Sequence, residues 1–208
     1  MEKLKSFKAA SIIAMVLATA LLFACQASSP SELTYEALCL GNNLFVITKT
    51  TEETKANLHL PLIGIFAGPQ DLQAGDVVAF NIDELMESFP PQAKISRSEK
   101  LAAENRSYAA GFLLAQQLLE IRPESTFLID VRTAEEFAEG HVPESINIPV
   151  GLIDEIRNCV PARDSTIFIY CRSGNRTVAA AKALWNLGYK VIFDLGGISG
   201  YSGDLEKG

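Results

Sequence analysis

The sequence is poor in histidine and cysteine, and it carries no excess of basic charge. Its 208 residues include two histidines and four cysteines, and no two cysteines form a Cys-x-x-Cys pair. Structural zinc sites are usually built from such closely spaced ligands, so the sequence implies no metal and no organic cofactor. The net charge is -7. Nucleic-acid binding depends on Lys and Arg side chains that neutralise phosphates, so we expect no nucleic-acid partner.

The uncharged apolar run at the N-terminus is too short for a membrane span. It covers residues 9–23, about 15 residues, and follows three lysines within the first eight positions. A transmembrane helix needs roughly 20 apolar residues. A charged segment followed by a short apolar run predicts a secretory signal instead.

The end of this run, Leu22-Phe23-Ala24-Cys25, resembles the bacterial lipobox, although Phe23 stands where a small residue is usual. The resemblance implies a lipoprotein signal peptide over residues 1–24, lipidation of Cys25 and a lipidated polar tether over residues 25–32. We therefore expect an extracytoplasmic lipoprotein of a bacterial cell envelope, held at the membrane by its lipid anchor. The alternative is an ordinary signal peptide followed by a spare cysteine.

Residues 33–98 have the pattern of a small β-rich domain. Apolar segments at residues 44–48, 62–66 and 76–82 predict strands, and Gly-containing segments between them predict turns. A small barrel-like or meander unit is expected. Residues 72–78 and 86–92 are similar to small secreted β-domains of unknown function in lipoproteins. This similarity implies no activity, and a folded spacer and a binding role both remain open.

After a polar boundary near residues 97–106, the pattern changes to alternating helices and strands. Helices are predicted over residues 109–121, 133–139, 151–159 and 176–187, and strands over residues 126–131, 145–148, 166–170 and 190–194. This alternation predicts an α/β domain over residues 105–208, with a parallel sheet covered by helices on both faces.

Cys171 begins the loop between the buried strand at residues 166–170 and the helix that follows. Ligands of such sheets bind beyond the carboxyl ends of the strands, near the positive N-terminus of the next helix. Surroundings that favour anions populate the thiolate, which is the nucleophile. Gly174 permits a tight bend, and Arg172 and Arg176 add positive charge for an anionic sulfur donor.

The second half of the chain resembles the rhodanese family in the order and spacing of several motifs. They are residues 129–132 (IDVR), 135–137 (EEF), 140–143 (GHVP), 146–149 (INIP), 170–176 (YCRSGNR), 188–189 (GY) and 195–197 (LGG). Two positions depart from the common pattern, since Glu144-Ser145 replaces Gly-Ala and Tyr201 lies where Trp is common.

The resemblance implies a rhodanese-type sulfurtransferase in which Cys171 is the catalytic nucleophile. Sulfane sulfur would pass from a small donor such as thiosulfate to Cys171, giving a persulfide, and then to a thiophilic acceptor, either cyanide or a thiol. The substrate-binding residues would be the loop residues Arg172, Ser173, Gly174, Asn175 and Arg176, whose backbone amides would hold the persulfide sulfur.

Two other functions remain open. Rhodanese folds also serve as non-enzymatic binding or sulfur-carrier modules, here at the membrane surface, although the complete loop with Cys171 argues for an enzyme. Cysteine-dependent phosphatases and arsenate reductases use Cys-x5-Arg, whereas Arg176 lies five positions after Cys171 and Thr177 lies at the sixth. The shorter loop favours a sulfur atom over a tetrahedral phosphate.

The remaining polar and thiol residues have less specific interpretations. The resemblance implies a structural role for His141, and Asp130 and Arg132 are expected to brace the end of the sheet. Cys39 and Cys159 could form a disulfide outside the cytoplasm, pack in the core, or, for Cys159, act as a resolving thiol.

Overall fold

The computed structural model describes residues 33–50, 62–67, 71–86, 88, 90–102 and 106–208. The predicted signal peptide, Cys25 and the tether lie outside these residues. The chain divides between residues 103 and 104 into two compact units. Within the described ranges, none of the helices combines the length and apolar character needed to span a membrane.

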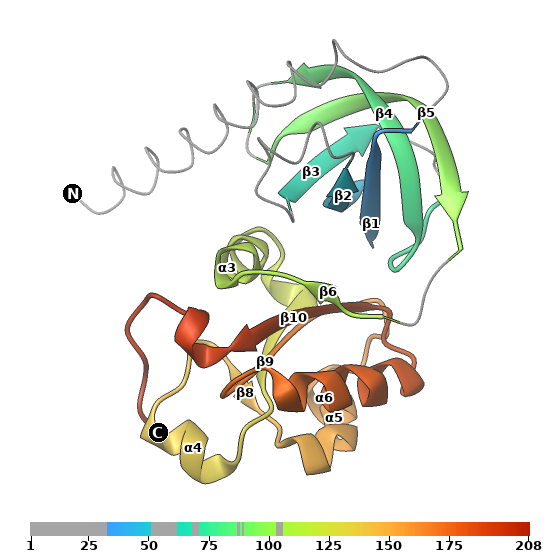
Figure 1. Ribbon diagram of the computed structural model, residues 1–208. Coiled ribbons are helices and arrows are strands. Elements are labelled where there is room, and N and C mark those ends of the chain that lie inside the picture. Colours follow the sequence, from blue (N-terminus) through green and yellow to red (C-terminus); the bar gives the residue numbers. More distant parts are fainter. Residues whose placement is uncertain (1–32, 51–61, 68–70, 87, 89, 103–105) are drawn as a thin grey trace, which may run out of the picture. The chain divides into compact units, whose positions relative to one another are not determined.

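The first unit is a closed barrel (Figure 1). Around the barrel the strand order is β1-β2-β3-β5-β4, and every pair is antiparallel except β3 and β5, which are parallel. An aromatic cluster that includes Phe45, Phe66 and Phe80 fills the interior. The strands are β1 (Tyr35–Gly41), β2 (Leu44–Thr50), β3 (Leu62–Ala67), β4 (Val77–Met86) and β5 (Gln92–Leu101).

The polar segment predicted as the start of the interdomain boundary belongs partly to the barrel. Strand β5 continues to Leu101, and its residues 97–101 pair with β4. Barrel strands need apolar side chains on their inner face only, so a charged sequence such as that of residues 97–100 can still form a strand. The three strands predicted from apolar runs are all present.

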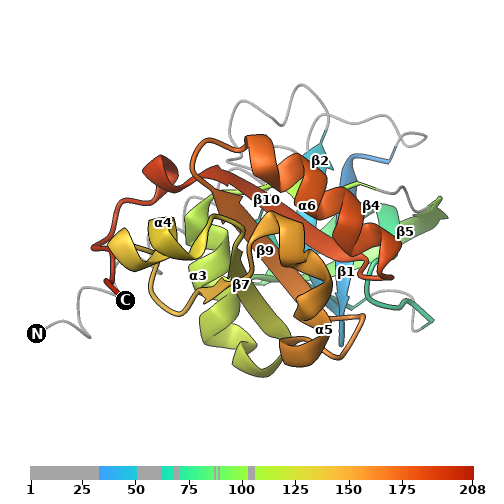
Figure 2. The same cartoon turned by 90° about the horizontal axis from the view of Figure 1, so that it is seen from below.

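The second unit is a parallel sheet in the order β6-β10-β9-β7-β8. This confirms the predicted α/β class. The central strand β9 is buried at all six positions. Figures 1 and 2 show α3 on one face of the sheet and α5 and α6 on the other. The strands are β6 (Tyr108–Ala109), β7 (Thr126–Asp130), β8 (Ile146–Asn147), β9 (Thr166–Cys171) and β10 (Val191–Gly197).

The helices of this unit are α3 (Phe112–Ile121), α4 (Ala134–Glu139), α5 (Ile156–Cys159) and α6 (Asn175–Asn186), with 3-10 turns η1 (Pro123–Ser125), η2 (Val150–Glu155) and η3 (Ile198–Gly200). Helix α4 begins with a capping box, in which Thr133 and Glu136 each bond the other's backbone N–H. The helix predicted over residues 151–159 is instead η2 followed by the short α5, because the backbone at Leu152 is not helical (φ -118°, ψ 19°).

Candidate active site

Cys171 is the last residue of β9, and the loop of residues 172–174 connects it to α6. Its side chain is fully buried and packs in the apolar cluster between the sheet and α6. Gly174 has φ +91°, which turns the loop back so that its N–H donates to Cys171 Sγ at 3.1 Å. A backbone N–H directed at sulfur stabilises negative charge there. The predicted strand-loop-helix arrangement around Cys171 is therefore present.

Strand β10 supports this loop through two adjacent glycines. A Cβ atom on Gly197 would lie 2.8 Å from the carbonyl oxygen of Arg172 and 3.2 Å from Cα of Ser173. A Cβ atom on Gly174 would likewise lie 3.4 Å from Cα of Gly196. Gly197, noted in the sequence only as part of a motif, thus allows the backbone of β10 to touch the backbone of the loop, whereas Gly196 adopts φ +72°, a conformation that favours glycine.

Asp194 fixes both segments at this contact. Its Oδ1 accepts a hydrogen bond from the N–H of Gly196 at 2.8 Å, and its Oδ2 lies 2.8 Å from Thr177 Oγ1. The buried Thr177 hydroxyl also lies 2.5 Å from the carbonyl oxygen of Gly174, so its one proton can be donated to either of these two acceptors. Sequence reasoning did not identify Asp194 as part of the site. Its position at the carboxyl end of a predicted strand was the available signal.

The guanidinium of Arg176 is paired with Glu136 of α4. Its Nη1 and Nη2 atoms donate to the two carboxylate oxygens at 2.5 and 2.9 Å. The bond from Arg176 lowers the pKa of Glu136 to about 2, so this carboxylate is ionised at neutral pH. The same bond raises the pKa of Arg176, with a smaller contribution from Cys171. Arg176 thus lies beside the thiol with its charge already compensated.

Three of the other predicted site residues lie at the surface, unlike the buried Cys171. The side chains of Arg172, Ser173 and Asn175 are exposed. Among the residues that the structure describes, Arg172 forms no ion pair. The six predicted residues thus span the end of β9, the loop of residues 172–174 and the first two residues of α6, with the sulfur buried and, among the described residues, Arg172 unpaired at the surface.

Asp130 and Arg132 brace the carboxyl end of the sheet, as predicted. The fully buried carboxylate of Asp130 accepts bonds from Arg132 Nε and Nη2, the latter at 2.7 Å, and Nη2 also donates to the carbonyl oxygen of Gly140. Next to this pair, the buried hydroxyl of Tyr170 accepts the N–H of Val142 at 3.1 Å. Burial raises the pKa of Tyr170.

His141 makes structural contacts, and Cys39 and Cys159 lie outside the Cys171 loop. The His141 ring stacks on Phe137, and its Nδ1 lies 3.0 Å from the Phe137 carbonyl oxygen. The backbone of His141 exchanges two hydrogen bonds with Glu206. Cys39 in the first unit and Cys159 in the second are free thiols in the structure.

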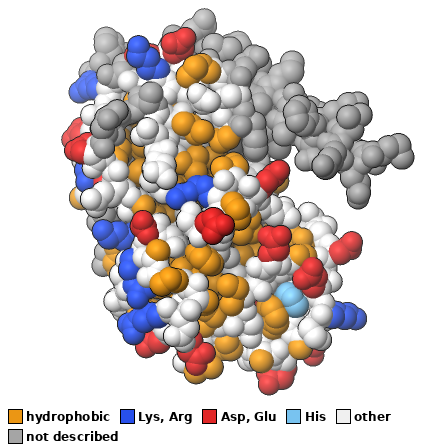
Figure 3. All heavy atoms as spheres, turned by 180° about the vertical axis from the view of Figure 1, so that it is seen from behind, with side chains coloured by type: hydrophobic (Ala, Val, Ile, Leu, Met, Phe, Trp, Pro, Cys, Tyr) orange, Lys and Arg blue, Asp and Glu red, His pale blue; other side chains and the backbone are white. Residues whose placement is uncertain are grey.

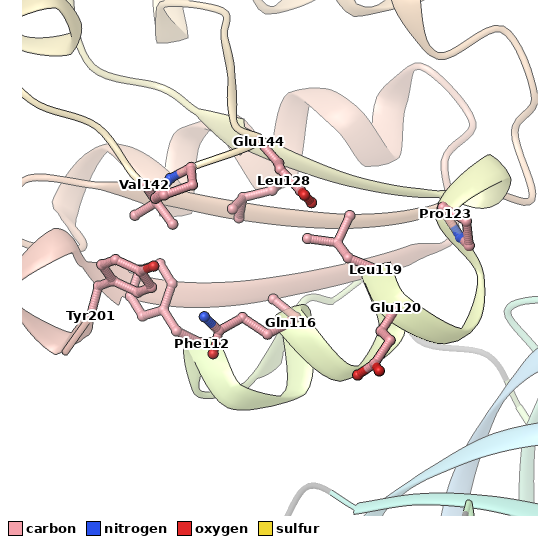
Figure 4. Close-up of a pocket in the computed structure, with 11 residues that line it drawn as sticks. Phe112, Gln116, Leu119, Glu120, Pro123, Leu128, Val142, Glu144 and Tyr201 are labelled. Carbon is pink, nitrogen blue, oxygen red and sulfur yellow. The ribbon is translucent and has the colours of Figure 1, made fainter. Parts of the chain in front are cut away.

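A cavity of about 420 Å³ lies on the α3 side of the sheet, and no residue of the Cys171 loop lines it (Figure 4). Phe112, Leu119 and Leu128 form part of its apolar wall. Glu144 at its edge has φ +64°, a conformation that favours glycine. On the face shown in Figure 3, hydrophobic and acidic side chains of this unit lie beside one another.

The fold and the loop define a parallel α/β domain with a thiol at a strand-to-helix turn, and comparisons with known proteins agree. Residues 114–204 match the family model described as rhodanese-like domain. A sulfurtransferase of Allochromatium vinosum is 36% identical over 84 residues, which cover 40% of this chain and 76% of that protein. The thiosulfate sulfurtransferase PspE of Escherichia coli is 33% identical over 81 residues, covering 38% and 78%.

The chain belongs to the rhodanese-like family, among whose members are proteins named sulfurtransferases. A mitochondrial relative of Schizosaccharomyces pombe is 39% identical over 80 residues, but the match spans 33% of this chain and 56% of that protein. The family membership accordingly concerns the second unit.

Proposed function

We propose that the protein is a sulfurtransferase that carries sulfur as a persulfide on Cys171. The Cys171 thiolate attacks the sulfane sulfur of a donor such as thiosulfate, a new S–S bond forms, and the donor's own S–S bond breaks with its electron pair on the leaving sulfite. A thiol or cyanide then attacks the outer sulfur and releases the Cys171 thiolate. The observation that carries this proposal is the Gly174 N–H directed at Cys171 Sγ at 3.1 Å.

The surroundings of the loop favour sulfur transfer over phosphoryl chemistry. A phosphatase of the Cys-x5-Arg type needs its arginine free to bind phosphate oxygens. Here Arg176 lies one position too early, and both of its terminal nitrogens bond Glu136. A single sulfur atom needs fewer donors, and backbone N–H groups of the loop and of the first turn of α6 can supply them.

The test is formation of the persulfide and its turnover on the full-length protein. After incubation with thiosulfate, intact mass should rise by about 32 Da, the mass of one sulfur atom. Cys171→Ser should lose both the adduct and thiosulfate:cyanide activity. Cys159→Ser, which removes another free thiol of the same unit, should retain both. Absence of adduct and turnover in the unmodified protein with several donors would instead indicate a binding module.

We further propose that the protein is an extracytoplasmic lipoprotein anchored through Cys25. This proposal depends on the lipobox-like sequence of residues 22–25 and the preceding apolar run. On expression in a bacterial host, the full-length protein should partition into the detergent phase of a Triton X-114 separation. Cys25→Ser should move it to the aqueous phase or leave the signal uncleaved. An unchanged partition of Cys25→Ser with the signal removed would refute lipidation at Cys25.

A further inference from the structure

One of the two arginine charges of the Cys171 loop is compensated by a carboxylate. Arg172 and Arg176 are cationic, but Glu136 binds Arg176 through two hydrogen bonds, and Asp194 contacts the loop through Thr177. Because the Glu136 carboxylate lies directly on the Arg176 guanidinium, a donor anion that approaches Arg176 meets a dipole and not a free cation.

This pairing has different consequences for different sulfur donors. Thiosulfate is a dianion, and it must approach a thiolate that is itself negative. Its binding therefore depends strongly on unpaired positive charge, and the repulsion is only weakly screened at short range. A small hydropersulfide, R–S–S–H, carries at most one negative charge on its sulfurs, so it needs less cationic compensation.

We propose that Glu136 determines donor specificity. By neutralising the charge of Arg176, it favours small-molecule hydropersulfides over thiosulfate as the sulfur donor. This inference rests on the proposed transfer through Cys171. The Cys171 thiolate attacks the terminal sulfur of R–S–S–H, and a bond forms between the two sulfurs. The bond between that sulfur and R–S breaks, its electron pair leaves with R–S⁻, and the proton stays on the transferred sulfur. No oxidant or reductant is consumed.

The position of Glu136 in α4 fixes the orientation of its carboxylate toward Arg176. Glu136 is the third residue of the helix, and its Oε2 also accepts the N–H of Thr133 at 3.2 Å. The capping box and the Arg176 pair thus use the same carboxylate, which holds it in one orientation. Glutamine also serves at this position of a capping box, so Glu136→Gln removes the charge and preserves the helix start.

The experiment measures the second-order rate constant for loading of Cys171 in single turnovers of the full-length protein. The donors are thiosulfate and 2-hydroxyethyl hydropersulfide, whose organic part is uncharged. Intact mass after alkylation gives the loaded fraction for both. Glu136→Gln should raise the thiosulfate rate constant about five- to tenfold and change the hydropersulfide rate constant less than about twofold. High salt should diminish the gain with thiosulfate.

Glu135→Gln is the matched control. It removes the same charge one residue earlier in the same helical turn, and the bonds of Glu135 stay within that turn, to its own backbone N–H and to Thr133. It should leave both rate constants unchanged. Equal changes with both donors, or a slower reaction of Glu136→Gln with thiosulfate, would overturn the specificity role and make Glu136 a support for the loop. Failure of the unmodified protein to load from either donor would overturn the proposed function itself.

Discussion

Replacement of Gly197 by alanine tests whether the contact between β10 and the loop sets the position of Cys171. Gly197 has φ -95° and ψ 146°, which alanine adopts without strain. The added methyl group, however, would lie 2.8 Å from the carbonyl oxygen of Arg172 and 3.2 Å from Cα of Ser173. Both are backbone atoms, so no side chain can rotate away and the loop itself must move.

The expected cost has a structural part and a catalytic part. Overpacking by one methyl group destabilises a well-packed site by about 1–3 kcal/mol. A displacement of reacting groups by about 1 Å can lower a rate by about 100-fold. We therefore expect Gly197→Ala to retain its fold, to melt at a lower temperature, and to form the Cys171 persulfide about 10- to 100-fold more slowly.

The assay combines thermal unfolding with the rate of persulfide formation read by intact mass. Gly151→Ala is the matched control, because a Cβ atom at this exposed glycine of the same unit would meet no atom within 4 Å. It should leave the loading rate unchanged. A loading rate for Gly197→Ala equal to that of the unmodified protein would refute the idea that the glycine contact positions the loop.

Three further predictions concern the supports of the site. Asp130→Ala should lower the free energy of unfolding by about 3–5 kcal/mol in urea titrations, because it leaves the charge of Arg132 buried and unpaired. Tyr170→Phe should cost about 1–3 kcal/mol in the same assay, since the N–H of Val142 loses its partner. The pKa of Glu136 is lowered from 4.5 to about 2, so its ion pair stabilises the fold above pH 4.5 and is lost as the pH falls through 2. Acid titrations should show that Glu136→Gln is less stable by about 1 kcal/mol or less at pH 7 and equally stable below pH 2.

Much of the second unit could be predicted because its signals are local. Strand β9 is a continuous apolar run, the start of α4 is marked by Thr133 and Glu136, and α6 ends before Gly188, whose φ is +93°. Each of these follows from residues within a few positions of one another. The order of strand, loop and helix around Cys171 could therefore be predicted from the amino-acid sequence.

The partners within the site could not be predicted, because they are far apart in the sequence. Arg176 meets Glu136 across 40 positions, and Asp194 meets Thr177 across 17. A sequence pattern suggests that an arginine is available to a ligand, but it does not reveal a carboxylate that already neutralises it. For this reason the charge balance of the loop emerged only from the structure.

In the barrel, the apolar runs predicted β2, β3 and β4, whereas β1 and the polar β5 were not predicted. Strand β5 carries charged residues in a segment expected to be a linker, and its parallel pairing with β3 closes the barrel. Closure depends on the pairing of strands about 30 positions apart, for example Ile65 with Gln92, and such pairings leave little trace in local composition.

The sheet of the second unit ends on both sides in strands of two residues, β6 and β8. An edge strand exposes unpaired backbone groups to which a strand of another molecule can add, and the risk grows with its length. Edges this short offer little template for intermolecular pairing, while the closed barrel has no edge at all. Both units thus leave little unpaired strand edge to which another molecule could add, which protects them against aggregation.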